Sequence, residues 1–257
     1  MATAARIIAT STEKAFVAGL PRRDARVAIL MPVHNGALAL RSTLESLRAR
    51  DEAVTVFLVD DGSEPAISPN DLPATSDAFR VVLARHVVNL GQGAALETAR
   101  QLALRDATHF SAYVTMDADG QHRAADAFAL ASAIEEGADV AFGNRFLGDS
   151  NVPPTRRAVL FLARWFERAI TGLRLADAHN GLRAFGRAAL ERVRIRQNRM
   201  AHATEIKLLV SRTELRIVEV PVSVRYTKET LARGQKNAGA ALILRDLMLQ
   251  YLFGDSK

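Results

Sequence analysis

The chain has no cysteine, which excludes disulfide bonds, thiolate zinc sites and a cysteine nucleophile. It also has no run near the roughly 20 apolar residues that a membrane-spanning helix needs. Arg6, Glu13 and Lys14 interrupt the apolar runs near the start, so no signal peptide is expected there. We therefore expect a cytoplasmic protein that is either free or peripherally bound at the inner face of the cell membrane.

Lysine and aromatic residues are scarce. Only five of the 34 basic residues are lysine, and aromatic residues make up 6% of the 257 residues. The formal charge of +6 therefore comes mainly from arginine, which suits phosphate and carboxylate partners. Either an anionic partner or a general enrichment in arginine explains it. Nucleic acid is not expected as a partner, because no stripe of aromatic and basic residues is present.

Short apolar runs alternate with longer helical patterns from residue 27 onward. Strands are predicted at 27–33, 54–60, 79–86, 110–117 and 138–145, and helices at 37–50, 93–105 and 124–137. This alternation predicts an α/β fold with a mainly parallel, Rossmann-like sheet flanked by helices. Further on we expect helices at 155–172, 201–212 and 238–254, a loop at 177–186 and a strand at 215–226.

Polar residues and glycines follow each of the first five predicted strands. They occur at 32–35, 60–63, 89–93, 117–119 and 143–145. Ligands of such sheets bind at the carboxyl ends of the strands, so this edge is the predicted ligand site. The glycines at 91 and 93 also open a predicted helix, where backbone N–H groups favour an anion.

Asp117 and Asp119 form a carboxylate pair at the end of a predicted strand. Neighbouring carboxylates raise each other's pKa unless a cation lies between them. Mg²⁺ or Mn²⁺ is typically held by one or two carboxylates together with substrate phosphates, and Gln121 offers a neutral oxygen nearby. The alternative interpretation is a solvent-exposed Asp-x-Asp-Gly turn.

Six segments carry a family resemblance: VHNG, VDDGS, NLGQGAALETA, MDADGQH, FGNRF and HNGLRAF, in that order. Together they resemble family 2 glycosyltransferases, especially bacterial enzymes related to polyprenyl-phosphate (dolichol-phosphate type) sugar synthases. The resemblance, over residues 26–245, implies a GT-A fold. It implies an N-terminal extension at 1–25 and one domain at 26–257, with a nucleotide-sugar-binding half (26–148) and an acceptor half ending in an apolar helix (149–257).

The implied activity is inverting, metal-dependent transfer of a sugar from a nucleoside-diphosphate sugar to a polyprenyl-phosphate or cell-surface glycan acceptor, in cell-envelope synthesis. The implied donor-site residues are Pro32, Asn35 and Asp61 at the nucleotide base, Asp117, Asp119 and Gln121 at a Mg²⁺ or Mn²⁺ ion, Arg145 and Arg156 at phosphate, and Arg233 and Lys236 in a loop that closes over the donor.

The resemblance places Asp177 at the start of the acceptor motif. A hydroxyl acceptor requires a general base, and Asp177 is the first candidate and Glu205 the second. Each has an alternative role as a helix-capping or ion-paired carboxylate. A phosphate acceptor is already an anion and requires no base. His122 is a further candidate for metal or substrate contact, and His179 and His202 are candidates for substrate contact.

Two questions stay open at the level of sequence. The apolar C-terminal helix either packs on the domain or in a homodimer, or lies on the membrane surface and receives a lipid acceptor. The chain is either the transferase described above, a catalytically degenerate nucleotide-sugar-binding scaffold, or a sugar-phosphate nucleotidylyltransferase. The last would need a basic, glycine-rich loop after the first core strand, where this chain has PVHNGALAL.

Overall fold

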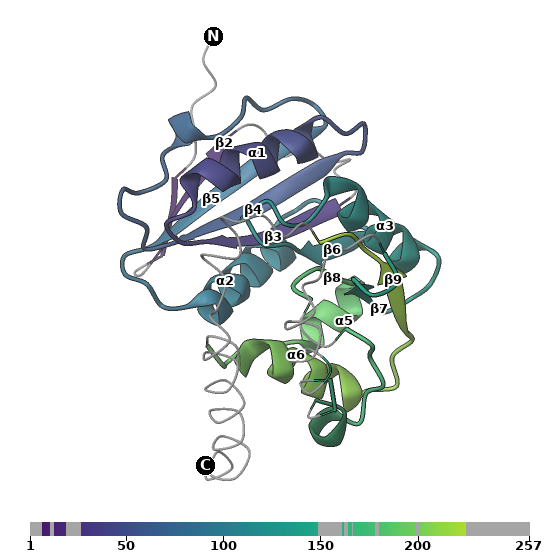
Figure 1. The fold of residues 1–257 in the computed structure, drawn as a ribbon. Helices are drawn as coiled ribbons and strands as arrows, with labels where there is room; N and C mark the ends of the chain where they lie inside the picture. Colours follow the sequence, from purple (N-terminus) through teal and green to yellow (C-terminus); the bar gives the residue numbers. More distant parts are fainter. Residues whose placement is uncertain are drawn as a thin grey trace.

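The computed structural model describes residues 7–10, 13–18, 27–148, 161, 164–165, 167–177, 180–198 and 201–224. In this part of the chain a nine-stranded sheet runs through the molecule in the order β1-β2-β5-β4-β3-β6-β8-β7-β9 (Figure 1). The strands are β1 (Ile7–Thr10), β2 (Glu13–Ala18), β3 (Val27–Val33), β4 (Val54–Asp61), β5 (Phe79–His86), β6 (Ala112–Thr115), β7 (Val140–Asn144), β8 (Arg183–Phe185) and β9 (Ile217–Pro221).

Helices cover both faces of the sheet. They are α1 (Ala37–Arg48), α2 (Gln92–Arg105), α3 (Ala124–Glu135), α5 (Arg187–Arg192) and α6 (Ala201–Ser211), with a short 3-10 helix η1 (Pro69–Asp71). Helices α1 and α3 pack on one face, and α2, α5 and α6 pack on the other (Figure 1). Every residue of β3 and β4 is buried, as expected for strands covered on both sides.

The predicted α/β architecture is confirmed. Strands β5, β4, β3 and β6 run parallel, and β7 pairs in parallel with β9. The strands predicted at 110–117 and 215–226 are assigned at 112–115 and 217–221, and the second prediction extends past Val224, outside the described residues.

The sequence missed three strands, β1, β2 and β8. The segment 177–186, predicted as a loop, contains β8, which lies antiparallel between β6 and β7. Three residues are too few to show a strand periodicity, and pairing on both sides stabilises them instead. Because β8 lies next to β6, it brings Asn180, Gly181 and Arg183 close to the carboxyl end of β6.

The edges of the sheet bear on the predicted domain limits. Residues 7–10 and 13–18 form the antiparallel strands β1 and β2, and β2 pairs antiparallel with β5. The division into an extension and two halves stays a prediction. Among the described residues, no helix is both long enough and apolar enough to cross a membrane.

Candidate active site

Asp117, which follows β6, is held by neighbours from three segments. The Gln92 side-chain amide at the start of α2 donates a 2.9 Å hydrogen bond to Asp117 Oδ1. His122 Nε2 lies 3.7 Å from Oδ2, an electrostatic contact beyond hydrogen-bond length. A Cβ atom on Gly181 would overlap Oδ2, so the backbone before β8 lies directly against the carboxylate. The Asp117 side chain is still 33% exposed and reachable by a ligand.

The two predicted metal-binding carboxylates have opposite electrostatic surroundings. Burial favours a higher pKa for Asp117, but its interaction with His122, together with the charges of Arg183 and His202, holds that pKa below its usual value. Burial, followed by the charge of Asp117, raises the pKa of Asp119. A cation between the two carboxylates would remove this repulsion.

This carboxylate pair fits a hard divalent cation whose remaining coordination positions are filled by water and by a phosphorylated substrate. Within the described ranges, no three or more histidine, aspartate and glutamate side chains converge as a metal cage. Mg²⁺ and Mn²⁺ sites built on two carboxylates take their remaining oxygens from water and substrate phosphate. The backbone N–H of Gln121 donates to Asp119 Oδ1 at 3.0 Å and so orients that carboxylate. The metal role of Asp117, Asp119 and Gln121 stays a prediction that the geometry supports.

Asp61 organises the loop that leads into α2. Its Oδ1 lies 2.7 Å from His86 Nδ1 and accepts a hydrogen bond from Leu90 N at 2.9 Å. Its Oδ2 accepts one from Gly91 N at 2.8 Å. The carboxylate is therefore buried and engaged with the protein. The contact of Asp61 with a nucleotide base stays a prediction. It would use the carboxylate lone pairs that accept no hydrogen bond from the protein.

Several backbone N–H groups at the start of α2 are already bonded within the protein, and an external anion there stays a prediction. Asp61 accepts from Gly91 N, and Asn198 Oδ1 accepts from Ala94 N at 2.9 Å. A Cβ atom on Gly93 would overlap Gln197 O, so glycine is required for the segment 193–198 to dock there. The carboxylate of Asp61 and the amide oxygen of Asn198 therefore occupy part of this helix start.

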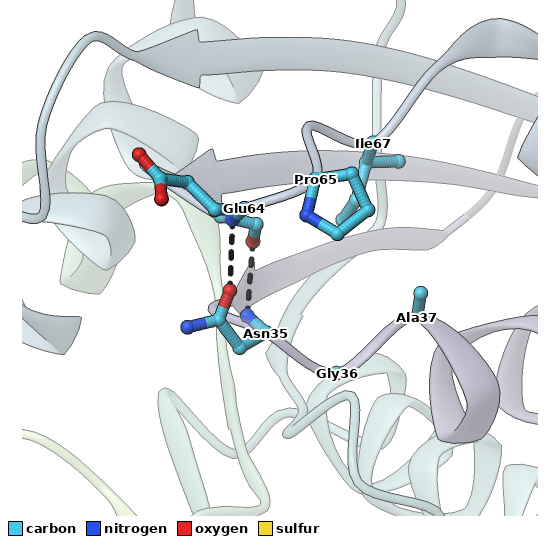
Figure 2. A pocket seen from close by; sticks show the side chains of 7 residues that line it. Asn35, Gly36, Ala37, Glu64, Pro65 and Ile67 are labelled. Carbon is cyan, nitrogen blue, oxygen red and sulfur yellow. Dashed lines mark hydrogen bonds between the residues drawn. The ribbon is translucent and has the colours of Figure 1, made fainter.

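The predicted base-binding residues lie at different depths. Asn35 has a left-handed backbone (φ 52°); its N–H donates to Ser63 Oγ and its Oδ1 accepts from Glu64 N, both at 2.9 Å (Figure 2). It lines a cleft of about 160 Å³ with Gly36, Ala37, Ser63, Glu64, Pro65 and Ile67. Pro32 is buried within β3 and does not line this cleft.

Arg145 and Asp177 form a buried ion pair. Arg145 Nε donates to Asp177 Oδ2 at 2.6 Å, and Arg145 N donates to the same oxygen at 2.9 Å. Asn180 Nδ2 also lies 3.2 Å from Oδ2. Asp177 Oδ1 is buried and has no hydrogen-bond partner. The contact of Arg145 with phosphate and the role of Asp177 as a general base stay predictions. In this structure the Asp177 carboxylate is ion-paired with the Arg145 guanidinium.

Glu205, the second candidate base, has a structural role. Its Oε2 accepts hydrogen bonds from Arg196 N at 2.9 Å and Gln197 N at 2.8 Å. Glu97 on α2 accepts from Ile195 N at 3.0 Å. Carboxylates from α6 and α2 thus clamp the segment 193–198 between the two helices, next to the start of α2.

A buried ionic cluster under the site escaped the sequence reading. Lys207 Nζ on α6 lies 2.7 Å from Glu167 Oε2, and Thr204 Oγ1 donates to Glu167 Oε1 at 2.7 Å. Burial lowers the pKa of Lys207 to about 8. Arg183 on β8 is also buried. The available signal was Lys207 itself, a charge within the apolar run of 206–210.

Several predicted residues lie outside the described part of the chain. These are Arg156, His179, Arg233, Lys236 and the C-terminal helix at 238–254. His122 and His202 are described, and both are buried near Asp117, whose pKa each of them lowers.

Comparison with known proteins agrees with this geometry. The chain is 31% identical over 176 residues to the polyprenol monophosphomannose synthase of Mycolicibacterium smegmatis, covering 67% of this chain and 66% of that protein. It is 25% identical over 246 residues to the UDP-N-acetylglucosamine–dolichyl-phosphate N-acetylglucosaminyltransferase of Methanococcus voltae, covering 88% and 97%.

The fold also matches solved structures. One is glucosyl-3-phosphoglycerate synthase from Mycobacterium tuberculosis, in complex with Mn²⁺, UDP-glucose and phosphoglyceric acid. The TM-score is 0.59 at 19% identity, over 89% of this chain and 79% of that one. This likeness establishes the GT-A fold, and the relatives are glycosyltransferases rather than nucleotidylyltransferases. The sequence model of glycosyl transferase family 2 matches residues 28–194, and the chain is a member of that family.

Proposed function

We propose that this glycosyltransferase is inverting and metal-dependent, and that it moves a sugar from a nucleoside-diphosphate sugar to a polyprenyl phosphate. The observation that carries the donor part is the pair Asp117 and Asp119 at the ligand edge of the sheet, with a raised pKa for Asp119. Two carboxylates that need a cation suit a metal-bound diphosphate. The M. tuberculosis neighbour was solved with Mn²⁺ and UDP-glucose, which supports the same donor chemistry.

The acceptor is inferred from the state of Asp177. A glycan hydroxyl must lose a proton to a base, but both candidates are already engaged. Asp177 is ion-paired with Arg145, and Glu205 accepts two backbone hydrogen bonds. A phosphate acceptor is an anion at neutral pH and needs no such base. The two curated relatives above carry names of enzymes acting on polyprenyl or dolichyl phosphates, which supports this choice.

In the proposed reaction the chain's own side chains mainly orient and balance charge. Asn35 and the cleft beside it take the nucleotide end of the donor. Gln92 and the backbone at Gly181 hold Asp117 in place, and Asp119 completes the carboxylate pair. A divalent cation bound there supplies Lewis-acid stabilisation of the charge on the departing diphosphate. A peripheral position at the inner membrane face would bring the lipid acceptor to this site.

The donor part is tested by thermal unfolding with UDP, GDP, CDP and dTDP, each with Mn²⁺, Mg²⁺ or EDTA. A ligand at 100 times its dissociation constant adds about 2.7 kcal/mol of stability. We expect one diphosphate to stabilise the protein only with metal, and Asp119→Ala to abolish the effect. The matched control is Asp77→Ala, because Asp77 is an exposed carboxylate that precedes β5, at the end of the sheet opposite to the ligand site. If no diphosphate stabilises the wild type, the proposed metal-diphosphate donor site is contradicted.

The acceptor part needs a separate assay. With the donor identified, transfer of labelled sugar is measured to a short polyprenyl phosphate and to the matching polyprenol. We expect product from the phosphate alone, with an inverted anomeric centre by NMR. Equal transfer to the alcohol would contradict the phosphate acceptor, and retained configuration would contradict inversion.

A further inference from the structure

Arg183 is a buried cation whose guanidinium has no hydrogen-bond partner among the described residues. It is 3% exposed and stands on β8, one residue after Leu182. It shares a sheet face with Phe185, which packs in the cluster that contains α6. No described carboxylate lies within ion-pair distance of it. Burial lowers the pKa of Arg183, while the charges of Asp117, Glu167 and Asp177 raise it.

The carboxylates around Arg183 are mostly already paired. Asp177 pairs with Arg145 at 2.6 Å, and Glu167 pairs with Lys207 at 2.7 Å. Among these groups the charges left over are Asp117 and Asp119 on one side and Arg183 on the other. Once a divalent cation neutralises the two aspartates, the guanidinium is the remaining buried charge. Such a charge is costly unless it is hydrogen-bonded to an anion.

Other unsatisfied atoms mark the same region. His122 Nδ1 and Asp177 Oδ1 are both buried without a hydrogen-bond partner. Both residues interact electrostatically with the groups named above: His122 with Asp117, and Asp177 with Arg183. Unsatisfied buried polar atoms are uncommon in folded proteins and indicate a missing partner. Thr55 Oγ1 and Arg80 Nε, near the starts of β4 and β5, are also unsatisfied, so it is the buried guanidinium of Arg183 near Asp117 that indicates a ligand at this edge.

We propose that Arg183 is an anion-binding residue of this site, whose guanidinium donates hydrogen bonds to phosphoryl oxygens of a ligand held at Asp117 and Asp119. The proposal rests on the proposed function, which brings two phosphorylated molecules here. The phosphoryl group belongs either to the donor diphosphate or to the lipid-phosphate acceptor. Arginine is suited to this role, because its planar fork binds two phosphate oxygens at once.

The test compares Arg183→Gln with Arg80→Gln. Arg80 is similarly buried, at 4%, but it lies near the start of β5 and bonds Asp106 at 2.6 Å, away from the ligand edge. Affinities are measured by calorimetry for Mn²⁺ alone, for the preferred nucleoside diphosphate with Mn²⁺, and for inorganic pyrophosphate with Mn²⁺. The KM for a short polyprenyl phosphate is measured at saturating donor.

We expect Arg183→Gln to weaken binding of at least one phosphoryl ligand by about 10- to 100-fold, the worth of a charged hydrogen bond. Binding of Mn²⁺ alone should stay the same or tighten, because a positive charge near Asp117 is gone. A variant that only disturbed the structure of the site would weaken binding of the phosphoryl ligand and binding of Mn²⁺ alone. Weaker diphosphate binding assigns Arg183 to the donor, and a raised KM for polyprenyl phosphate assigns it to the acceptor. Arg80→Gln should leave all four values unchanged.

Arg183→Lys keeps the proposal testable if the glutamine variant does not fold. It retains the charge but loses the fork, so an intermediate loss of affinity is expected. Unchanged phosphoryl affinities and KM in the folded variants overturn the proposal, as does a wild type that binds neither pyrophosphate nor polyprenyl phosphate. A wild type that binds pyrophosphate but no nucleotide contradicts the proposed donor and leaves the role of Arg183 measurable.

Discussion

Replacing Gly181 by alanine tests whether the position of Asp117 controls the reaction. The added Cβ atom would overlap Asp117 Oδ2 and lie 3.1 Å from its Cγ. Carbon atoms pack best at about 3.5–4.0 Å, so the carboxyl group must move by about 0.4–0.9 Å. That shift strains the 2.9 Å hydrogen bond from Gln92. No functional group is removed, and Gly181 is not among the glycines with a positive φ.

The expected effect falls on metal binding and turnover rather than on folding. Misplacing a reacting or metal-binding group by about 1 Å costs roughly 100-fold in rate, whereas overpacking costs about 1–3 kcal/mol of stability. Mn²⁺ affinity is measured by electron paramagnetic resonance at fixed nucleoside diphosphate, and kcat by transfer of labelled sugar.

The matched control is Gly186→Ala, at the other end of β8. A Cβ atom there meets Ile134 Cγ2 at an ordinary 3.6 Å, so metal affinity and kcat should not change. If Gly181→Ala keeps its Mn²⁺ affinity and kcat within about twofold of the wild type, the carboxylate position does not limit the reaction and the reasoning fails.

Three further predictions concern other contacts. Gln92→Leu removes the donor to Asp117 and should raise the Mn²⁺ dissociation constant about tenfold, as loss of an outer-shell partner does; an unchanged constant in a metal titration would contradict this. Asp61→Asn places an N–H group against backbone donors and should cost about 1–3 kcal/mol in urea unfolding; full stability would contradict the network. Because burial lowers the pKa of Lys207 from 10.5 to about 8, the unfolded chain holds more protons between these values, and the free energy of unfolding should rise with pH through this window. Relative to the wild type, Lys207→Met/Glu167→Leu should lack that contribution, and parallel profiles would refute it.

Much of the fold could be predicted from local pattern. The apolar runs that became β3, β4 and β5 are long and bounded by turn residues, and the intervening helices carry clear helical spacing. Strand β8 could not be predicted, because its three residues gain their stability from pairing with β6 and β7. The carboxylate pair Asp117 and Asp119 was also visible, since two acids at a strand end need only local sequence to be recognised.

The partners of the site residues could not be read in the same way. Asp61 is adjacent to a turn in the sequence, but its hydrogen bonds reach His86, Leu90 and Gly91. Asn198 accepts from the backbone at Ala94, a separation of 104 residues. No periodicity reports such contacts, because they arise only when α2 and the segment 193–198 pack together.

The sequence by itself determined the α/β alternation, the polar edge and the presence of the aspartate pair. These follow from side-chain period and turn chemistry, which act over a few residues. The tertiary structure alone decided which charges pair. It joined Arg145 to Asp177 and Lys207 to Glu167, and it left the guanidinium of Arg183 buried with no hydrogen-bond partner in the described part of the chain. Pairing inside a protein depends on distances between elements far apart in the chain, and packing sets those distances.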